Sequence, residues 1–402
     1  MKIFIGTNNI ANILSGLKAG LEDLGHTVTA VLKDKSKYYT DEGYQTIYRK
    51  WDHRNPKIEL LNRVKEKIDY STQAKKSNKL LIDSLKDTDL YIFLWSSFLT
   101  DYSDYEILCK HNKKVITLFA GSEVRYSQAF AQEYNLNIDK WEEGLRDDDI
   151  NEKLNYTRIA ELYSNYIVSV PDQSGLMLRD YDHFYLPIDL KKYQFNPNSN
   201  QIPKLIHAPT RTGIKGTEVF LEVIEKLKSE GLKFEFSFLQ NLSHVDLMKK
   251  IQQSDVLLDE LYFHGPGMMA TEAMALGCAV ATRKLNDDKK RFDAPVASIN
   301  FENVYSVIKE LIQNESLRLK YKSDGRKFVE NVNDAKIVAS RLINRIDSIE
   351  RDYSADFLRK SFFLPSNVAI NSANKLKTKW IIEKFLKDPD SLIKNFLKKG
   401  LV

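Results

Sequence analysis

Cysteine is scarce in this sequence. Of 402 residues only Cys109 and Cys278 are cysteines, which is too few for a disulfide framework or for a cysteine-ligated zinc site. We therefore interpret both as packing residues of a protein that resides in a reducing compartment.

Long apolar runs are also missing. The best candidate, residues 90–99, is interrupted by Ser96 and Ser97 and falls short of the roughly 18 residues that a membrane-spanning helix needs. The apolar start of the chain turns polar at Thr7, which leaves no room for the core of a secretory signal. We expect a cytoplasmic protein without a spanning helix.

Net charge is absent from most of the chain. The whole sequence carries +5, and residues 350–402 contain 11 Lys or Arg against 6 Asp or Glu, so residues 1–349 balance to zero. A protein that binds duplex nucleic acid needs a basic face on its folded part. We therefore expect no nucleic-acid partner.

Strand-like and helix-like segments alternate in the first half of the sequence. Apolar residues at Ile13, Leu14, Leu17, Leu21 and Leu24 have the period of a core-facing helix, and short apolar runs precede and follow it. Such alternation predicts a parallel, doubly wound sheet for residues 1–185. The expected strands are 2–6, 27–32, 90–94, 114–118 and 166–170.

A proline-containing stretch, 186–203, interrupts this pattern and is interpreted as a hinge. The alternation restarts in residues 204–349, which predicts a second α/β domain, and 350–402 follow as a basic helical extension. Two such domains leave a cleft at the carboxyl ends of both sets of strands. The expected strands here are 204–207, 234–239, 256–258 and 279–282, and the expected helices are 217–230, 243–252 and 271–276.

The first motif spans residues 207–217 and lies between an expected strand and an expected helix. A diphosphate needs backbone N–H groups of a glycine-containing turn, a helix N-terminus and one or two cations. Here Gly216 supplies the turn, Arg211 a planar fork for two oxygens, and Lys215 a compact charge. The alternative is a solvated basic loop.

The second motif spans residues 259–277. Gly265 and Gly267 flank Pro266 in a turn that leaves the backbone open to a ligand. Glu272 is expected in the first turn of the following helix, where its carboxylate can accept hydrogen bonds from the vicinal hydroxyls of a ribose. The alternative is an acidic residue that the helix macrodipole favours.

Together these motifs resemble the donor half of GT-B glycosyltransferases, most closely the retaining glycosyltransferase family 4. That family has a Glu, seven residues, Glu pattern before an Ala-Met-Ala-x-Gly helix. Glu272 and residues 273–277 match its second half, whereas His264 occupies the place of the first carboxylate. Two replacements stay open: His264 donates to the same oxygens, or Asp259 or Glu260 supplies the carboxylate.

The resemblance covers residues 1–349 and implies roles for residues of both domains. Glu123 and Arg125 match a Gly-Ser-Asp-x-Arg turn and would face acceptor or donor across the cleft, with a structural salt bridge as the alternative. The implied catalytic residues are Arg211, Lys215, His264 and Glu123. The implied donor-binding residues are Glu272, Gly265, Gly267, Met268, Thr210, Gly216, Leu239 and Asn9, and Ser122 and Arg125 lie on the acceptor side.

The implied function is transfer of a sugar from a nucleotide sugar to a glycan or lipid-linked glycan, in cell-surface polysaccharide synthesis. Arg211 and Lys215 would stabilise the leaving nucleoside diphosphate, with retention and with no metal or other cofactor. Asp-x-Asp triplets at 147–149, 180–182 and 388–390 are expected by chance among 55 acidic residues.

Two other functions are alternatives to sugar transfer. A catalytically silent protein that binds a sugar nucleotide or a glycan is favoured by His264. A nicotinamide-dependent oxidoreductase would need a Gly-x-Gly-x-x-Gly turn after the first strand, which this sequence lacks.

The basic extension has two interpretations. In residues 375–387 apolar side chains occupy one helical arc and lysines the other. Residues 372–402 would therefore either contact an anionic membrane, peripherally on the inner face of the plasma membrane, or pack on the first domain.

Overall fold

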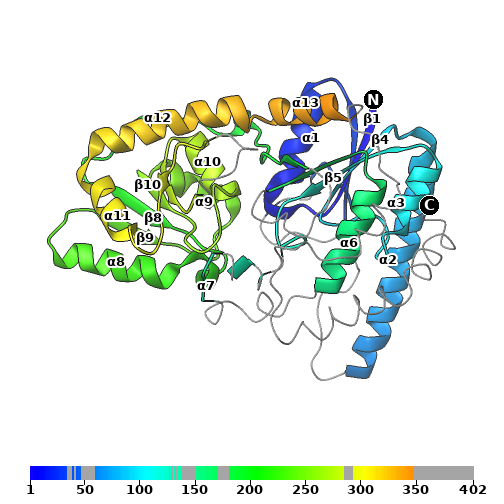
Figure 1. The fold of residues 1–402 in the computed structure, drawn as a ribbon, viewed down its shortest axis with the longest axis horizontal. Helices are drawn as coiled ribbons and strands as arrows, with labels where there is room; N and C mark the ends of the chain where they lie inside the picture. Colours follow the sequence, from blue (N-terminus) through cyan, green and yellow to red (C-terminus); the bar gives the residue numbers. More distant parts are fainter. Residues whose placement is uncertain are drawn as a thin grey trace.

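The computed structural model describes residues 1–33, 39, 42–46, 59–125, 127, 130–131, 134–137, 150–170, 181–284 and 293–346. It consists of two parallel β-sheets, each covered by helices (Figure 1). The basic extension and the triplets at 147–149 and 388–390 lie outside the described residues, as does Asp180. The α/β fold with two doubly wound sheets is confirmed.

The N-terminal sheet has the strand order β3-β2-β1-β4-β5-β6-β7, with every pair parallel. Its strands are β1 Lys2–Thr7, β2 Thr27–Leu32, β3 Gln45–Thr46, β4 Leu90–Leu94, β5 Lys114–Phe119, β6 Tyr166–Ser169 and β7 Asp182–His183. The helices around it are η1 Ile10–Asn12, α1 Ile13–Asp23, α2 Glu59–Asp87, α3 Ser103–Lys110 and α6 Ile150–Tyr163. We call this part the N-terminal unit.

The alternation of side chains along β4 explains why this sheet needs helices on both faces. Ile92 and Leu94 join the core cluster that contains α1, whereas Tyr91 and Phe93 join the cluster that contains α3 and α6. A strand buried on both faces has a continuous apolar sequence. This continuous apolar sequence allowed both ends of β4 to be predicted correctly.

The C-terminal sheet has the order β12-β11-β10-β8-β9 and is also parallel. Its strands are β8 Lys204–His207, β9 Glu235–Phe238, β10 Val256–Leu258, β11 Ala279–Thr282 and β12 Ala297–Ser298. Its helices are α7 Thr212–Lys215, α8 Thr217–Ser229, α9 His244–Gln252, α10 Met268–Leu276, α11 Val304–Gln313 and α12 Glu315–Val332. We call this part the C-terminal unit.

One helix begins three residues earlier than predicted, whereas the ends of α8 and α9 differ by at most one residue. The sequence predicted a helix from residue 271, but α10 begins at Met268 with Gly267 as its N-cap. Glu272 is therefore in the second turn and not in the first. A macrodipole explanation of its charge is correspondingly weaker, because that effect is confined to the first turn.

The chain returns to the N-terminal unit after α12. The final described helix, α13 Ala335–Arg345, lies beside α1, and α12 and α13 run along the same side of both units (Figure 1). The amide of Ile188 donates to the carbonyl of Asn333 at 2.9 Å, and the amide of Ala335 donates to the carbonyl of Ile188 at 2.9 Å. Two chain crossings therefore join the units, while the domain limits at 185, 203 and 349 stay predictions.

Gly20 of α1 permits this close approach, and its substitution is expected to destabilise the fold. A Cβ at Gly20 would lie 2.0 Å from the carbonyl oxygen of Ala335. We expect Gly20→Ala to lower the free energy of unfolding by about 1–3 kcal/mol, as overpacking does, in urea denaturation. Exposed Glu22→Ala on the same helix is the control; equal effects of the two substitutions would refute the explanation.

Among the helices of the described residues, none combines the length and the apolar character that a membrane crossing requires.

Candidate active site

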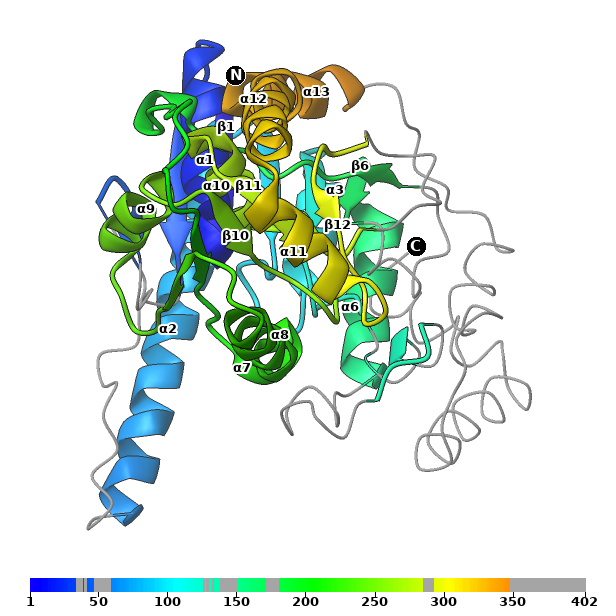
Figure 2. The same ribbon diagram turned by 90° about the vertical axis from the view of Figure 1, so that its left-hand side faces the viewer.

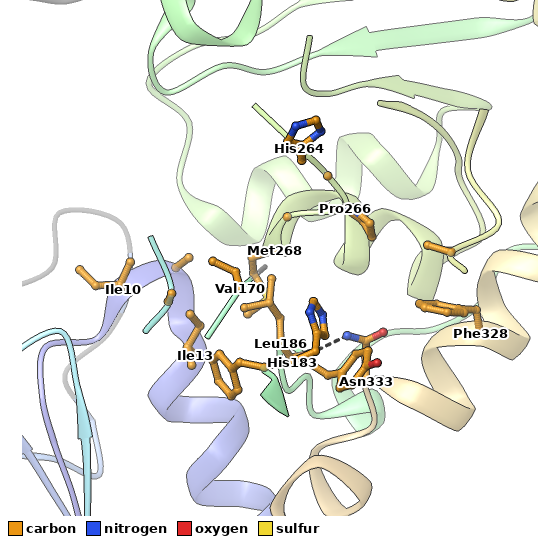
Figure 3. A pocket seen from close by; sticks show the side chains of 17 residues that line it. Ile10, Ile13, Val170, His183, Leu186, His264, Pro266, Met268, Phe328 and Asn333 are labelled. Atoms are coloured by element: carbon orange, nitrogen blue, oxygen red, sulfur yellow. Dashed lines mark hydrogen bonds between the residues drawn. The ribbon is translucent and has the colours of Figure 1, made fainter. Parts of the chain in front are cut away.

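The two units meet at the carboxyl ends of their strands around a pocket of about 160 Å³ (Figure 3). The N-terminal unit contributes the η1 segment after β1, Ala120 after β5 and Val170 after β6. The C-terminal unit contributes residues 264–268, and the crossing segment contributes residues 183–186. This interdomain pocket lies where parallel α/β sheets commonly bind ligands.

A second pocket, of about 110 Å³, lies at the ends of β8 and β9. Its walls are residues 208–210 and 239–242, with His244 and Leu247 of α9. Tyr39 of the N-terminal unit also lines it, and the ring centroids of Tyr39 and His244 are 5.1 Å apart. Apolar walls with aromatic rings suit a planar base; hence we name this the base pocket.

The turn of the first motif is fixed by a buried histidine. His207 Nδ1 lies 2.7 Å from the carbonyl oxygen of Leu258, and its Nε2 lies 2.8 Å from Thr217 Oγ1. Burial lowers the pKa of His207 to about 4, so the ring is neutral and donates from Nδ1 to the carbonyl. The bond to Thr217 joins the end of β8 to the start of α8.

Lys215, the predicted catalytic cation, lies among carboxylates. Its Nζ is 2.8 Å from Asp259 Oδ1 and 2.8 Å from Glu260 Oε2. Burial alone would lower the pKa of Lys215, but the two carboxylates outweigh it and raise the pKa above its ordinary value. Asp259 and Glu260, considered as replacements for the missing carboxylate at position 264, thus hold Lys215 at the end of α7.

Arg211 and Thr210 are exposed on the preceding turn. Arg211 is the N-cap residue of α7, with extended backbone. Gly216, between α7 and α8, has a φ of +75°, and a Cβ there would lie 2.8 Å from Leu261 Cβ. A glycine is therefore required at this position for the backbone to turn and for Leu261 to pack.

Glu272 is buried and interacts with two aromatic residues. Its Oε1 accepts hydrogen bonds from the Tyr193 hydroxyl at 2.6 Å and from His244 Nε2 at 2.8 Å. Burial, followed by the Glu272 carboxylate, raises the pKa of Tyr193 well above its ordinary value, so that hydroxyl stays protonated. Glu272 therefore orients His244, which lines the base pocket beside Leu239.

His264 lies in a contact between the two units. Its ring centroid is 4.5 Å from that of Tyr134 and 5.8 Å from that of Phe130, both from the N-terminal unit. The Arg125 guanidinium lies 3.7 Å from the centroid of the Phe263 ring. Arg125 thus reaches across the cleft to the loop that carries His264.

The two glycines of the second motif differ in the space around them. A Cβ at Gly265 would lie 2.4 Å from Thr282 Oγ1, so packing against β11 requires that glycine. No atom of the described residues lies within 4 Å of a Cβ at Gly267, whose position beside Met268 faces the interdomain pocket. Of the two, Gly267 leaves open space toward a ligand.

The side chain of Asn9 is hydrogen-bonded to the first turn of α1. Its Oδ1 accepts the amide hydrogen of Leu14 at 3.1 Å, and its Nδ2 donates to Asn12 Oδ1 at 3.4 Å. These bonds occupy the side chain that was predicted to meet a phosphate. The neighbouring Ile10 and Ala11 line the interdomain pocket.

Glu123 is turned toward the backbone of its own loop, which also contains Ser122. Its Oε1 accepts the amide hydrogen of Ala120 at 2.6 Å. Burial raises the pKa of Glu123 to about 7, against the opposing effects of that hydrogen bond and of Arg125. The carboxylate therefore positions Ala120, which lines the interdomain pocket.

The raised pKa of Glu123 predicts a pH dependence of stability. Between its unfolded pKa near 4.5 and its folded pKa near 7 the folded state binds more protons, so the free energy of unfolding falls as pH rises. We expect Glu123→Gln to remove this fall, with the difference from wild type growing to about 2–3 kcal/mol at pH 8. Urea denaturation at pH 5 to 8 measures it, with exposed Glu302→Gln as control; parallel curves for wild type and Glu123→Gln would contradict the assignment.

Four residues of this region were not predicted from the sequence: Tyr39, Tyr193, His244 and Arg283. Arg283 follows β11, donates from Nη1 to the carbonyl of Tyr262 at 3.0 Å, and has its pKa lowered by burial. None of the four belongs to either motif. The end of a predicted strand at Thr282 was the signal that could have found Arg283.

No family model and no curated protein matches this sequence, whereas solved structures do match the fold. Sucrose-phosphate synthase from Thermosynechococcus elongatus superposes with a TM-score of 0.57 at 11% identity, over 87% of this chain and 98% of that one. An alpha-glucosyltransferase in complex with UDP and a 13-mer DNA has a TM-score of 0.54 at 13% identity, over 86% and 99%. A mutant of S. aureus TarM, in complex with fondaparinux, alpha-GlcNAc-glycerol and UDP, has 0.55 at 9% identity, over 86% and 99%.

These similarities extend over both sheets, because each covers more than four fifths of this chain. The chain therefore has the GT-B fold of these transferases, as the two motifs predicted. At identities this low the comparison concerns the fold, and membership of glycosyltransferase family 4 stays a prediction.

Proposed function

We propose that this protein is a glycosyltransferase that moves a sugar from a nucleotide sugar to a glycan or lipid-linked glycan. The observation that carries the proposal is the placement of the first motif between two pockets. Thr210 lines the base pocket, Lys215 lies at the other end of the same turn, and residues 264–268 line the interdomain pocket. A base, a diphosphate and a sugar would occupy these three places in that order.

The chemistry required of this turn is stabilisation of a leaving diphosphate. Arg211 is exposed and offers a bidentate donor, while Lys215 is held in place by Asp259 and Glu260. A pre-positioned cation stabilises developing charge without reorganising during the reaction. The two carboxylates also pair with Lys215 in the absence of substrate.

We extend the proposal to the stereochemistry of transfer, the metal requirement and the location of the protein. We propose retention, as the resembled family implies. The acceptor hydroxyl would attack from the face that the diphosphate leaves, because His264 stands where a route through a glycosyl-enzyme intermediate would need a carboxylate nucleophile. We propose activity without metal or cofactor and a cytoplasmic role in cell-surface polysaccharide synthesis. The solved structures support use of a nucleotide, since two of them contain UDP.

A second function, silent binding of a sugar nucleotide, is favoured by one observation. His264 packs against Tyr134 and Phe130, where a transferase of the resembled family has a carboxylate near the sugar. In a silent binder these ring contacts would be the whole role of His264.

A panel of UDP-, GDP- and ADP-sugars separates the two functions. We expect one donor to raise the melting temperature and to be hydrolysed slowly, at an equal rate in EDTA and in manganese. Binding without hydrolysis, even with acceptor extracts added, would replace the transferase proposal by silent binding. Loss of hydrolysis in EDTA with rescue by manganese would overturn metal independence.

A further inference from the structure

The N-terminal unit contains a third pocket, of about 220 Å³, that belongs to neither motif. It lies between the middle of α2 and the segment that joins β4 to α3, and α2 extends beyond the rest of the unit from there (Figure 2). We propose that this pocket binds a neutral sugar unit of the acceptor, at a distance from the reacting hydroxyl. The inference rests on the proposed function and names the substrate class of its acceptor side.

The floor of the pocket contains a buried cation whose charge is balanced. Lys33 is 9% exposed, and its Nζ donates to the carbonyl of Ser97 at 2.5 Å. The fully buried carboxylate of Asp104 interacts with Lys33 electrostatically and accepts a hydrogen bond from Ser97 Oγ at 2.8 Å. A floor with paired charges does not favour an anionic ligand such as a phosphate.

The walls of the pocket present both hydrogen-bond donors and hydrogen-bond acceptors. Within the described residues, the Asn78 amide makes no hydrogen bond, and Asp101 uses only Oδ1, which accepts from Ser103. Gln73 uses only its Nε2, which donates to the carbonyl of Lys33 at 3.1 Å. One amide and two further acceptor oxygens thus remain for a ligand, and sugar hydroxyls can both donate to and accept from them.

The aromatic content of the pocket argues against a base. Among the described residues that line it, Phe98 is the only aromatic one, and it is 1% exposed, so it offers no ring face to a ligand. A planar base needs such a face, as Tyr39 provides in the base pocket. A sugar that presents hydroxyl edges needs none.

The third pocket and the interdomain pocket both lie at the carboxyl ends of strands of the N-terminal sheet. Lys33 follows β2 and Asp101 lies in the segment after β4, with β1 between these strands. The residues after β1, β5 and β6 line the interdomain pocket. A chain of sugars can therefore run along the carboxyl ends of these strands from one pocket to the other.

Hydrogen bonds tie the segment after β4 to the end of β1. Thr7 Oγ1 lies 2.5 Å from Ser96 Oγ and donates to the carbonyl of Ser97 at 3.4 Å. The carbonyl of Ser97 thus accepts from both Thr7 and Lys33, which fixes the start of the segment that lines the third pocket. No described residue lines both pockets, so an acceptor with its reacting hydroxyl in the interdomain pocket would need at least one further sugar unit to reach the third pocket.

The test measures binding of three neutral sugars, maltotriose, cellotriose and N,N′,N″-triacetylchitotriose, to the full chain by ligand-observed NMR. We expect one trisaccharide to bind, and Asn78→Ala and Asp101→Ala each to weaken it about tenfold. Exposed Lys79→Ala and Asp83→Ala, on α2 outside the pocket, are the matched controls and should bind as wild type. Because Asn78 and Asp101 are exposed, we expect all four variants to fold.

Different results test the sugar pocket and the transferase proposal. Absence of binding by all three sugars, or equal binding by Asn78→Ala and Lys79→Ala, overturns the sugar pocket. Donor hydrolysis should be unchanged in Asn78→Ala, because the substitution does not touch the donor site. If no donor is bound or hydrolysed while trisaccharide binding still depends on Asn78, the transferase proposal fails and the sugar pocket stands.

Discussion

Replacing Lys215 by glutamine is expected to lower the rate of donor turnover about 100- to 1,000-fold, which is the effect of removing one donor to a developing negative charge. The substitution also leaves Asp259 and Glu260 buried without their cation. Breaking a buried pair in this way typically costs about 3–5 kcal/mol, so the rate must be compared at temperatures where the variant is folded.

A triple variant separates the catalytic effect of Lys215 from its structural effect. Lys215→Gln combined with Asp259→Asn and Glu260→Gln removes all three charges, and we expect it to recover stability but not turnover. Arg211→Gln should lower turnover with no loss of stability because Arg211 is exposed, whereas exposed Lys233→Gln should change neither. Wild-type turnover in the triple variant would show that Lys215 serves only to balance its two neighbours.

Replacing Glu272 by alanine is expected to raise the KM for the donor about 10- to 100-fold, a loss of roughly 1.4–2.7 kcal/mol. Our reason is that Glu272 orients His244 at the base pocket through the 2.8 Å hydrogen bond. Steady-state hydrolysis of the donor found in the nucleotide-sugar panel measures it.

Substitutions of the two hydrogen-bond partners of Glu272 test whether it affects the KM for the donor through His244. If it acts through His244, then His244→Ala should give the same increase in KM, and the double variant should add nothing further. Tyr193→Phe is the control for stability, since it removes only the other hydrogen bond of Glu272, 2.6 Å long. Independent, additive effects of Glu272→Ala and His244→Ala would show instead that each residue contacts the donor separately.

Most of the fold was predictable because parallel strands are buried on both faces. β4, β8, β10 and β11 have short apolar sequences that identify them without any tertiary information. The edge strand β9 is largely exposed and was predicted two residues too long. The start of α10 was missed because Gly267 caps it, and a glycine there was interpreted only as an open turn.

The site was predictable in parts but not in its connections. Each motif identified its own residues, such as Lys215 in the first and Asp259 in the second, yet their ion pair joins positions 44 residues apart. Tyr193 lies 79 residues from Glu272 and in no motif. Contacts of this kind depend on how the sheets bring loops together, which local spacing does not encode.

The burial of Glu123 was equally outside the reach of sequence analysis. The motif suggested a carboxylate facing the cleft or a salt bridge, whereas the structure shows it accepting the backbone amide of Ala120. Its role is therefore to shape the loop beside the interdomain pocket.

A crystal structure of the protein soaked with the nucleotide sugar selected by the panel tests the central claim most directly. The account predicts the base between Tyr39 and His244, the diphosphate within hydrogen-bond distance of Arg211 and Lys215, and the sugar beside His264 and Gly267. A donor bound elsewhere, or bound with its diphosphate away from Arg211 and Lys215, would contradict it.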